Sequence, residues 1–481
     1  MTTRPNISAI VLTALVSSAA ATFGLWIWFS AIPPQHIHAR IPSQTSDQIA
    51  DNTPPIVDLS GTFETFDGTP ANSSSSWPGF RGPNGDNIAT SPVPLADTWP
   101  THGPPLLWSV ELGNGYAAPA VENGRVYLLD YDVQQKCDAL RCFSLADGRE
   151  IWRRSYAINI KRNHGISRTI PAVTQAFVVS MGPKCHVLCV DADSGSFRWG
   201  LDLARDYGTE VPLWYTGQCP IIDNGEAILA PGGDNALLMG VSCTTGEIVW
   251  KTPNPDQWNM SHASIIPVTL FGTRMFVYCA LGGIIAVSAE PEHRGALLWK
   301  TTEWSHSVIA PSPVFLPDGH MLVTAGYGVG SRMFQIHNST TTTPWKVELL
   351  HTWPRTQFAC EQQTPICFDG RLFTVMPNDA GPLNRQLVCM TPDGKPLWSS
   401  GKNWRFGLGP FMIVDNRILI LSDDGALTMA NANADKFDPM ATADILDGRE
   451  AWGPLALVDG LLLCRDTTRM VCLDLRKGET P

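Results

Sequence analysis

A short sequence frame recurs along this chain about every fifty residues. Its clearest copy, VLCVDADSGSFRW (residues 187–199), places Asp191, Gly195 and Trp199 at intervals of four residues. Related stretches end in tryptophan, with 46 to 53 residues between successive copies, at Trp152, Trp199, Trp250, Trp299, Trp345 and Trp398. A period of this length, built from short strands and turns, is typical of a β-propeller in which each repeat forms one four-stranded blade.

A second periodic feature predicts the number of blades. Ahead of each frame, proline introduces an apolar strand that is followed by a hairpin turn, as in AAPAVENGRVYLL (117–129) and QCPIIDNGEAILA (218–230). Asn-Gly between two apolar strands is a strong hairpin signal. Eight such units occur, and the seventh keeps its hairpin although its frame is lost. The sequence therefore predicts an all-β, eight-bladed propeller.

The two ends of the repeat region complement each other. The last unit stops after Asp474 and Gly478, before any tryptophan or outer strand. Near the start, PPLLWSVEL (104–112) supplies an apolar strand with Trp108 and has no repeat ahead of it. We expect this N-terminal strand to complete the last blade, which closes the ring and leaves no open first edge. The propeller is thus assigned to residues 104–481.

The residue types in the frame favour a structural role. The aspartate or serine can bond to its own turn, glycine supplies a positive φ, and tryptophan is a large plate that can fill the space between blades. Direct contact of these tryptophans with a ligand is the alternative. Four of the twelve cysteines share one place in the repeat, so we expect small buried residues rather than disulfide partners at Cys142, Cys189, Cys389 and Cys472.

The first 103 residues fall into four segments. Residues 1–6 form a short tail, and residues 7–32 carry no charge, a run longer than the roughly 20 apolar residues that span a bilayer. Trp26 and Trp28 stand near its far end, where interfacial aromatic residues are typical. We predict a transmembrane anchor here, with a cleaved signal peptide as the alternative. A disordered linker over residues 33–76 and an extension over residues 77–103 that packs on the propeller would follow. The propeller would then lie in the periplasm or another extracytoplasmic space.

The charge of the chain argues against nucleic-acid binding. The formal net charge is -11, and no run of lysine and arginine occurs, whereas a nucleic-acid binder needs a basic stripe. The glycine-rich stretch GYGVG (326–330) lacks the lysine of a P-loop. Cysteine and histidine do not show the spacing of a zinc site.

In its frames the chain resembles the pyrroloquinoline-quinone (PQQ)-like β-propeller repeat family, whose repeats read A-x-D-x-x-T-G-x-x-x-W. The likeness covers about residues 104–481. The stretch WPGFRGPNGDN (77–87) is similar to the opening segment of membrane-anchored bacterial members. We expect Trp77, Phe80 and Arg81 to pack on the propeller, with a contribution to a site as the alternative.

The resemblance implies the eight-bladed fold but leaves two functions open. One branch comprises PQQ-dependent dehydrogenases, which hold quinone and calcium over the propeller axis. In many of its alcohol dehydrogenases two adjacent cysteines form a disulfide, and this chain has no such pair. The other branch contains BamB, a non-catalytic scaffold of outer-membrane assembly. We expect an extracytoplasmic scaffold for a protein or peptide partner, without a cofactor. The alternatives are a quinoprotein oxidoreductase using PQQ and Ca²⁺, or a module that binds a small ligand or carbohydrate. No catalytic residue, cofactor-binding residue or metal ligand can be assigned.

If a site exists, we expect it in the loops that enter each first strand, because these converge at one mouth of a propeller. Their polar and aromatic residues are Tyr116, His164, Arg168, Trp214, Tyr215, His262, His306, Gln362, Gln363 and Trp452. Such a set could form a funnel for a ligand or peptide, and its three histidines could bind a metal. A purely structural role in the loops remains the alternative.

Overall fold

The computed structural model describes residues 15, 17–26, 56–161, 164–338, 344–448 and 450–478. It contains two compact units, Met1–Thr53 and Pro54–Pro481. In the first unit, residues 15 and 17–26 are helical. No helix within the described residues is long and apolar enough to cross a membrane. Most of the predicted anchor over residues 7–32, the tail over 1–6 and the part of the predicted linker over 33–55 lie outside the described residues.

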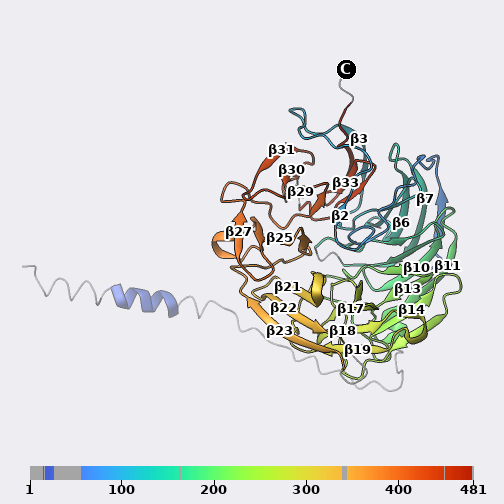
Figure 1. Cartoon of the computed structure of the whole chain (residues 1–481), viewed down its shortest axis with the longest axis horizontal. Coiled ribbons are helices and arrows are strands. Elements are labelled where there is room, and N and C mark those ends of the chain that lie inside the picture. Colours follow the sequence, from blue (N-terminus) through green and yellow to red (C-terminus); the bar gives the residue numbers. More distant parts are fainter. Residues whose placement is uncertain are drawn as a thin grey trace, which may run out of the picture. The chain divides into compact units, whose positions relative to one another are not determined.

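The second unit is an all-β propeller of eight sheets, as predicted. Each sheet contains one blade of four antiparallel strands, and two of the eight sheets carry a fifth strand. The blades follow one another around a common centre (Figure 1). In seven blades the four strands are consecutive in the sequence. In the eighth, one strand comes from the segment that precedes the first repeat. We number the blades 1 to 8 in chain order of their first strands.

The blades are built from short strands joined by short turns. Blade 1 consists of β4 (Ala120–Glu122), β5 (Arg125–Asp132), β6 (Cys137–Ser144) and β7 (Glu150–Ala157), and blade 2 of β8 (Ala172–Val173), β9 (Phe177–Met181), β10 (His186–Asp191) and β11 (Phe197–Asp202). Blade 3 consists of β12 (Ile221–Asp223), β13 (Glu226–Leu229), β14 (Leu238–Ser242) and β15 (Ile248–Thr252), and blade 4 of β16 (Ile266–Leu270), β17 (Thr273–Ala280), β18 (Gly283–Ser288) and β19 (Leu297–Thr301). Blade 5 consists of β20 (Val314–Phe315), β21 (His320–Ala325), β22 (Gly330–His337) and β23 (Lys346–Trp353), and blade 6 of β24 (Ile366–Phe368), β25 (Arg371–Val375), β26 (Leu387–Met390) and β27 (Pro396–Ser399). Blade 7 consists of β28 (Phe411–Val414), β29 (Arg417–Leu421), β30 (Ala426–Asn431) and β31 (Pro439–Asp444), and blade 8 of β32 (Ala456–Val458), β33 (Leu461–Arg465), β34 (Arg469–Asp474) and β3 (Leu106–Glu111). The helical segments of this unit are α2 (Leu203–Tyr207), η1 (Pro291–His293), η2 (Pro317–Gly319) and η3 (Gly381–Leu383).

The frame tryptophans occupy one register position in six blades. Each stands on the outer strand opposite a third-strand residue, and the ladder shifts by one residue beside that pair. In four of these blades the partner is a cysteine: Cys142 faces Trp152, Cys189 faces Trp199, Cys389 faces Trp398 and Cys472 faces Trp108. All twelve cysteines are unpaired, and these four are buried.

Each frame joins one blade to the next. Trp199 of blade 2 donates its indole N–H to the Cys243 carbonyl of blade 3 at 3.0 Å. A Cβ atom on Gly246, in the same turn of blade 3, would come within 2.7 Å of the Trp199 ring. Trp152 meets Gly195 in the same way, again with 2.7 Å to a Cβ. Glycine is therefore required at this position for two reasons. It adopts the positive φ of the turn, and it leaves the space that the tryptophan of the preceding blade fills.

Blade 5 departs from the predicted frame. The register places His351, not Trp345, opposite Met333 at the repeat position. Trp345 precedes β23, and its ring lies 6.4 Å from that of Phe271 in blade 4. Trp353, two residues after His351, instead lies against Gly394 of blade 6. The physical reason is that the turn IHNSTTTTPW lacks the frame glycine, so it does not fix where the outer strand begins.

The predicted linker over residues 33–76 ends earlier than the composition suggested. Residues 56–76 are described, and β1 (Thr62–Thr65) adds a fifth strand to the edge of blade 1 by pairing with β7. Phe63 lies 6.5 Å from the Trp152 ring, and the Arg154 guanidinium lies 4.9 Å from the Phe63 ring. The prediction of disorder for this part is wrong because TFET has strand propensity and its one aromatic residue covers a frame tryptophan.

The outer strand of blade 8 comes from the start of the repeat region. β3 pairs antiparallel with β34, and the Asp474 N–H donates to the Pro105 carbonyl at 2.9 Å. This bond links the two segments where a continuous frame would have its turn. No neighbour lies within 4 Å of a Cβ placed on Gly478, so this residue does not form the packed joint seen in the other frames.

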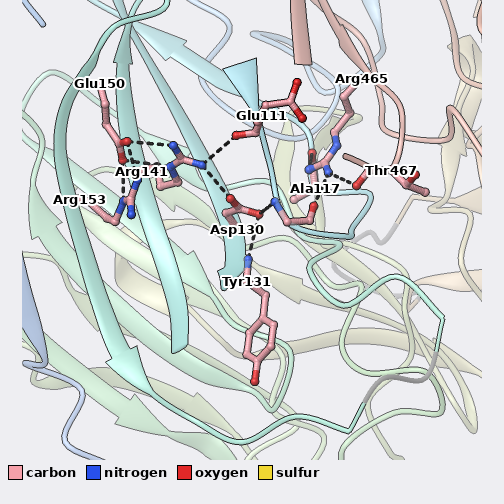
Figure 2. A network of polar contacts seen from close by, with 10 residues as sticks. Glu111, Ala117, Asp130, Tyr131, Arg141, Glu150, Arg153, Arg465 and Thr467 are labelled. Atoms are coloured by element: carbon pink, nitrogen blue, oxygen red, sulfur yellow. Dashed lines mark hydrogen bonds and ion pairs between the residues drawn. The ribbon is translucent and has the colours of Figure 1, made fainter. Parts of the chain in front are cut away.

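Arg465 ties blade 8 to the loop that enters blade 1 (Figure 2). This fully buried guanidinium donates to the carbonyls of Gly113 at 3.1 Å and Ala117 at 3.2 Å. It also donates to the carbonyls of Asp466 and Thr467, both at 2.8 Å. Backbone carbonyls alone thus satisfy a buried charge at the junction of the first and last blades.

A polar network continues from this loop into blade 1. Asp130 accepts the Gly113 N–H at 2.7 Å and an N–H of Arg141 at 2.9 Å (Figure 2). Arg141 also binds both carboxylate oxygens of Glu150 and reaches the Glu111 carbonyl on β3 at 3.2 Å. The N-terminal strand is therefore held by side chains as well as by its ladder.

The extension over residues 77–89 crosses the centre of the ring. Trp77 exchanges backbone hydrogen bonds with Val121 of blade 1. The Arg81 guanidinium, which is buried, donates to the Thr364 and Pro365 carbonyls at the entrance to blade 6, both at 3.0 Å. β2 (Ile88–Ala89) then runs parallel to β28 of blade 7. The extension thus passes from one side of the central channel to the other.

Candidate functional site

A cavity of about 480 Å³ lies at the mouth where the loops enter the first strands. Eight of the ten residues predicted for this mouth line it, so the loops converge as expected: Tyr116, His164, Arg168, Trp214, His262, Gln362, Gln363 and Trp452. They come from loops that lead into blades 1, 2, 3, 4, 6 and 8. We call this cavity the mouth pocket.

The other two predicted residues do not line the mouth pocket. Tyr215 turns away and donates its hydroxyl to the Lys161 carbonyl. His306 packs edge-on against Trp304, with 4.5 Å between ring centroids. Tyr215 thus contacts the neighbouring loop that enters blade 2, and His306 contacts a residue of its own loop.

The extension forms part of the wall and separates two cavities. Phe80 lines both the mouth pocket and a second cavity of about 160 Å³, whose wall includes Gly82, Pro83 and Gly85. Arg81 lines the mouth pocket only. Phe80 therefore lies between the two cavities and forms part of the wall of each.

One side of the mouth pocket is an aromatic cluster with a carboxylate. Tyr116 lies 5.4 Å from the His164 ring and 5.2 Å from the Trp452 ring. Its hydroxyl donates to a carboxylate oxygen of Glu450 and lies 3.2 Å from Nδ1 of His164. Burial and this bond to Glu450 raise the pKa of Tyr116, so the phenol stays protonated and acts as a donor.

The opposite side is an aromatic stack. Trp214 lies 5.8 Å from Tyr327 and 6.3 Å from His262, with the rings nearly parallel. Trp214 has φ of 64° and Tyr327 has φ of 56°, values that large side chains rarely adopt. Burial, and then the charge of Arg168, lower the pKa of His262 to about 4, which keeps its imidazole neutral at pH 7.

Arg168 is the cation of the mouth pocket whose hydrogen bonds are not satisfied. Its guanidinium lies 5.3 Å from the centre of the Tyr116 ring. Its Nε and Nη2 are buried and find no hydrogen-bond partner among the described residues. Burial lowers the pKa of this guanidinium, but arginine keeps its charge in proteins. Arg168 therefore brings a positive charge to the wall of the mouth pocket, while its Nε–Nη2 edge faces the protein interior.

A third part of the wall is acidic and internally bonded. Asp423 accepts the Trp452 indole N–H at 2.6 Å and the Leu408 N–H at 2.8 Å. Arg385 donates its Nε–H to Asn378. Burial raises the pKa of Glu361, and the nearby charge of Asp379 raises it further. Asp423 and Arg385 thus already have hydrogen-bond partners in the wall.

Sequence reasoning missed the residues that come from a second set of loops. Tyr327, Arg385 and Asp423 lie in the connections between second and third strands. In a blade of four antiparallel strands these connections end at the same mouth as the loops entering the first strands. The position of a loop in the strand order of its blade therefore predicts at which mouth the loop lies, and the sequence contained this information. Phe80 and Arg81 were named as packing residues, and they also line the mouth pocket.

The predicted histidines do not assemble a metal site. His164 and His262 line the mouth pocket, whereas His306 does not. No group of three or more His, Cys, Asp and Glu side chains that could hold a metal occurs among the residues that the structure describes.

A larger cavity of about 1140 Å³ lies at the outer strands of blades 3 and 4. Four of its charged residues are paired with one another, Arg294 with Glu226 at 2.9 Å and Lys300 with Asp256, and Lys251 and Glu292 line it as well. Its walls come from two neighbouring blades, whereas the mouth pocket gathers the loops of six.

Comparison with known proteins supports the fold. A family model described as Outer membrane protein assembly factor BamB matches residues 105–211 and 136–302. The structure of BamB from Moraxella catarrhalis superposes with a TM-score of 0.50 at 14% identity, covering 77% of this chain and 99% of that one.

Two further solved structures give lower TM-scores. The computationally designed Ika8 protein gives a TM-score of 0.49 at 11% identity, over 76% of this chain and 99% of that one. The quinohemoprotein alcohol dehydrogenase of Comamonas testosteroni gives 0.45 at 11% identity, over 85% and 82%. No curated protein matches the sequence. By its frames, its eight blades and the match over residues 105–302, the chain is similar to the PQQ-like β-propeller repeat family.

Proposed function

We propose that this chain is a non-catalytic binding protein that holds a protein or peptide partner in the mouth pocket. The observation that carries this proposal is the convergence of aromatic and polar side chains from six inter-blade loops on one cavity. Cavities of this size, with aromatic walls and few polar groups, are typical binding sites. The fold shared with BamB, the outer membrane protein assembly factor, is consistent with a scaffold.

The donors around the mouth pocket favour binding over quinoprotein chemistry. Calcium requires six to eight oxygen ligands. In the acidic wall, however, Asp423 accepts two hydrogen bonds and the Asn378 oxygen accepts one from Arg385. Both bonds to Asp423 end on Oδ1, and no group of three or more His, Cys, Asp and Glu side chains that could hold a metal occurs among the described residues. The side chains present therefore do not fit a calcium–quinone pair, and no oxidation step is assigned to them.

Peptide selection on the full-length protein tests the proposal. A library of random peptides is passed over wild type and over the Trp214→Ala variant, and Kd values of the selected peptides are measured by tryptophan fluorescence. Trp345→Ala is the matched control, since that tryptophan lies between blades 4 and 5. We expect peptides that bind wild type and the control equally and bind Trp214→Ala at least about tenfold more weakly. Peptide binding that ignores Trp214 would contradict the proposed site.

A parallel arm tests the oxidoreductase alternative. The full chain is incubated with PQQ and Ca²⁺ and assayed with alcohols and sugars in the presence of an artificial electron acceptor. Reproducible PQQ-dependent turnover would refute a non-catalytic role.

We propose further that residues 7–32 anchor the chain in a membrane, with the propeller on the extracytoplasmic side. The run of 26 uncharged residues supports this. Carbonate extraction and protease protection of the expressed chain test it, and release of the intact chain into the soluble fraction would overturn it.

We also propose that β3 holds the ring closed. Its pairing with β34 and its contact with Arg141 support this. Deletion of residues 104–112 should destabilise blade 8 first, which hydrogen exchange would detect as loss of protection in β32–β34.

A further inference from the structure

We infer that the cavity between blades 3 and 4 binds an extended segment of a partner protein, which pairs with the free edge of β15 and lays an aromatic side chain against Trp250. We call this cavity of about 1140 Å³ the blade 3 groove. β15 is the last strand of its sheet and pairs only with β14 among the described residues. Addition of a peptide strand to such an edge is a common mode of recognition. The groove is separate from the mouth pocket, so the inference does not rest on the proposed function.

The chain itself makes this kind of contact where blades 1 and 2 meet. β1 pairs antiparallel with β7, and Phe63 stands opposite Arg154. The Phe63 ring lies 6.5 Å from that of Trp152, and a Cβ on Gly195 would come within 2.8 Å of the Phe63 ring. An added strand thus places an aromatic side chain between the outer strand of one blade and the frame turn of the next.

The blade 3 groove occupies the same position in the repeat. The frame tryptophan of blade 3, Trp250, and the frame glycine of blade 4, Gly295, both line it. Val249 and Leu297 line it as well, and each is more than half exposed. At this joint no described residue takes the place that Phe63 fills at the joint of blades 1 and 2.

Hydrogen bonds show that the two joints are built alike. Arg154 donates its Nε–H to the Gly195 carbonyl at 2.8 Å, and Thr252 donates its hydroxyl to the Gly295 carbonyl at 2.6 Å. Arg154 and Thr252 each stand two residues after the frame tryptophan of their blade. Because threonine is the shorter of the two, it leaves more space above the turn in blade 4.

Trp250 presents an apolar surface to the groove. Its ring stacks on that of Phe276, with 6.1 Å between centroids and 8° between planes. Its indole N–H already donates to Glu226 at 2.9 Å. Trp250 remains half-buried, whereas Trp152, beside Phe63, is only 2% exposed. An aromatic side chain suits this surface, since paired rings gain more than their buried area alone.

The charges of the two joints specify a neighbour for that aromatic residue. Glu64 follows Phe63 and stands opposite Arg153. The residue of blade 3 that corresponds to Arg153 is Lys251, which is exposed, lines the groove and forms no ion pair among the described residues. An acidic residue of the partner fits opposite Lys251. Glu292 of η1 also lines the groove, so one acidic residue is expected rather than a run of them.

The free edge of β15 is short. The Thr252 carbonyl accepts the Leu237 N–H at 2.8 Å and so faces β14. Because backbone groups alternate along a strand, those of Lys251 face the free edge. Pro253 has no N–H to donate, so the ladder ends at Thr252. β1 has only four residues and is held in the same way.

The sequence favours a partner over the chain's own linker as the occupant. Residues 33–55 contain no phenylalanine, tyrosine or tryptophan. The groove therefore fits an extended segment of another protein in which an aromatic residue is followed by aspartate or glutamate.

A labelled peptide tests the inference on the full-length chain. The probe is SGTFETFD, the sequence of residues 60–67, with blocked ends and a fluorescent label. Binding is measured by fluorescence anisotropy for wild type, Leu297→Glu, Lys251→Glu and Leu397→Glu. The last is the matched control, because Leu397 is a partly exposed leucine on the outer strand of blade 6, outside the groove. Melting temperatures of both leucine variants are compared to exclude unfolding.

We expect the probe to bind wild type and Leu397→Glu equally. Leu297→Glu should bind at least about tenfold more weakly, because the added charge would be buried against the aromatic residue. The probe carrying Phe63→Ala should not bind. Lys251→Glu should bind about threefold more weakly, and the probe carrying Glu64→Lys should restore its binding. Hydrogen exchange should show that the probe protects the Lys251 amide.

The other outcomes overturn the inference. Binding that Leu297→Glu retains but Trp214→Ala loses would place the probe in the mouth pocket and support the proposed function alone. Binding that neither change weakens would indicate that the probe replaces β1 on blade 1. No binding up to about 1 mM of probe would show that the groove does not accept such a segment.

Discussion

The joint between Trp199 and Gly246 allows the role of the repeated frame to be tested quantitatively. Trp199 is 7% exposed and donates to the Cys243 carbonyl at 3.0 Å. Truncation of a buried aromatic residue of this size costs about 3–5 kcal/mol of unfolding free energy. We therefore expect Trp199→Ala to lower the free energy of unfolding by an amount in this range.

The glycine partner separates two contributions to the joint. At Gly246, φ is 78° and a Cβ would lie 2.7 Å from Cγ of Trp199. At Gly225, in the hairpin of the same blade, φ is 80° and no atom lies within 4 Å of a Cβ. Gly225→Ala should thus report the cost of positive φ alone, roughly 1–2 kcal/mol. Gly246→Ala should add about 1–3 kcal/mol of overlap with the ring.

A double-mutant cycle decides whether the overlap is real. Unfolding free energies of wild type, the three single variants and Trp199→Ala/Gly246→Ala are measured by guanidinium denaturation followed by circular dichroism. In the Trp199→Ala background, Gly246→Ala should cost no more than Gly225→Ala, which gives a coupling of about 1–3 kcal/mol. Equal cost of Gly246→Ala in both backgrounds would refute the reasoning that the tryptophan needs a residue without Cβ.

Four further results are expected. Burial raises the pKa of Asp138 to about 7. Folding therefore binds a proton between pH ~4 and ~7, and stability falls as the pH rises through that window. Denaturant titrations at pH 8 should then show that Asp138→Asn raises the free energy of unfolding by on the order of 3 kcal/mol. Arg465→Met should lose more than about 3 kcal/mol, because four carbonyls lose a charged donor; a loss below 1 kcal/mol would contradict this. The folded-state pKa of His262 is depressed to about 4, so its contribution to stability is lost as the pH falls from ~6.5 to ~4, and Arg168→Gln should raise that pKa in an NMR titration. Tyr327→Asn should change stability by less than about 1 kcal/mol, since asparagine tolerates positive φ, yet weaken peptide binding.

The fold could be predicted from the sequence because its determinants are local and repeated. Asp191, Gly195 and Trp199 specify a turn and an edge contact within one repeat, and each copy is independent evidence for the same blade. The prediction failed where a copy was degenerate. In blade 5 the frame glycine is missing, and only the ladder reveals that His351 takes the place assigned to Trp345.

The mouth pocket was predictable only in part. Loop position in the repeat identified Arg168 and Trp214, because every loop of that class ends at one mouth. The sequence alone could not separate Tyr215 from Trp214, since adjacent residues of one loop point in different directions. Nor could it show that Phe80 lines the cavity, because that depends on a segment crossing the axis far from its sequence neighbours. The unmet donors of Arg168 are a property of three-dimensional packing alone.

The joints and the mouth treat the same backbone conformation in opposite ways. At the joints, positive φ is assigned to glycine, as at Gly195 and Gly246, so the turns are free of strain and the tryptophans fit. At the mouth, Trp214 and Tyr327 adopt positive φ with bulky side chains, at roughly 1 kcal/mol or more each. Both side chains line the mouth pocket together with Arg168. Backbone strain thus occurs at the mouth, at the end of the blades opposite the frame turns. We interpret it as the cost of directing these side chains toward a ligand.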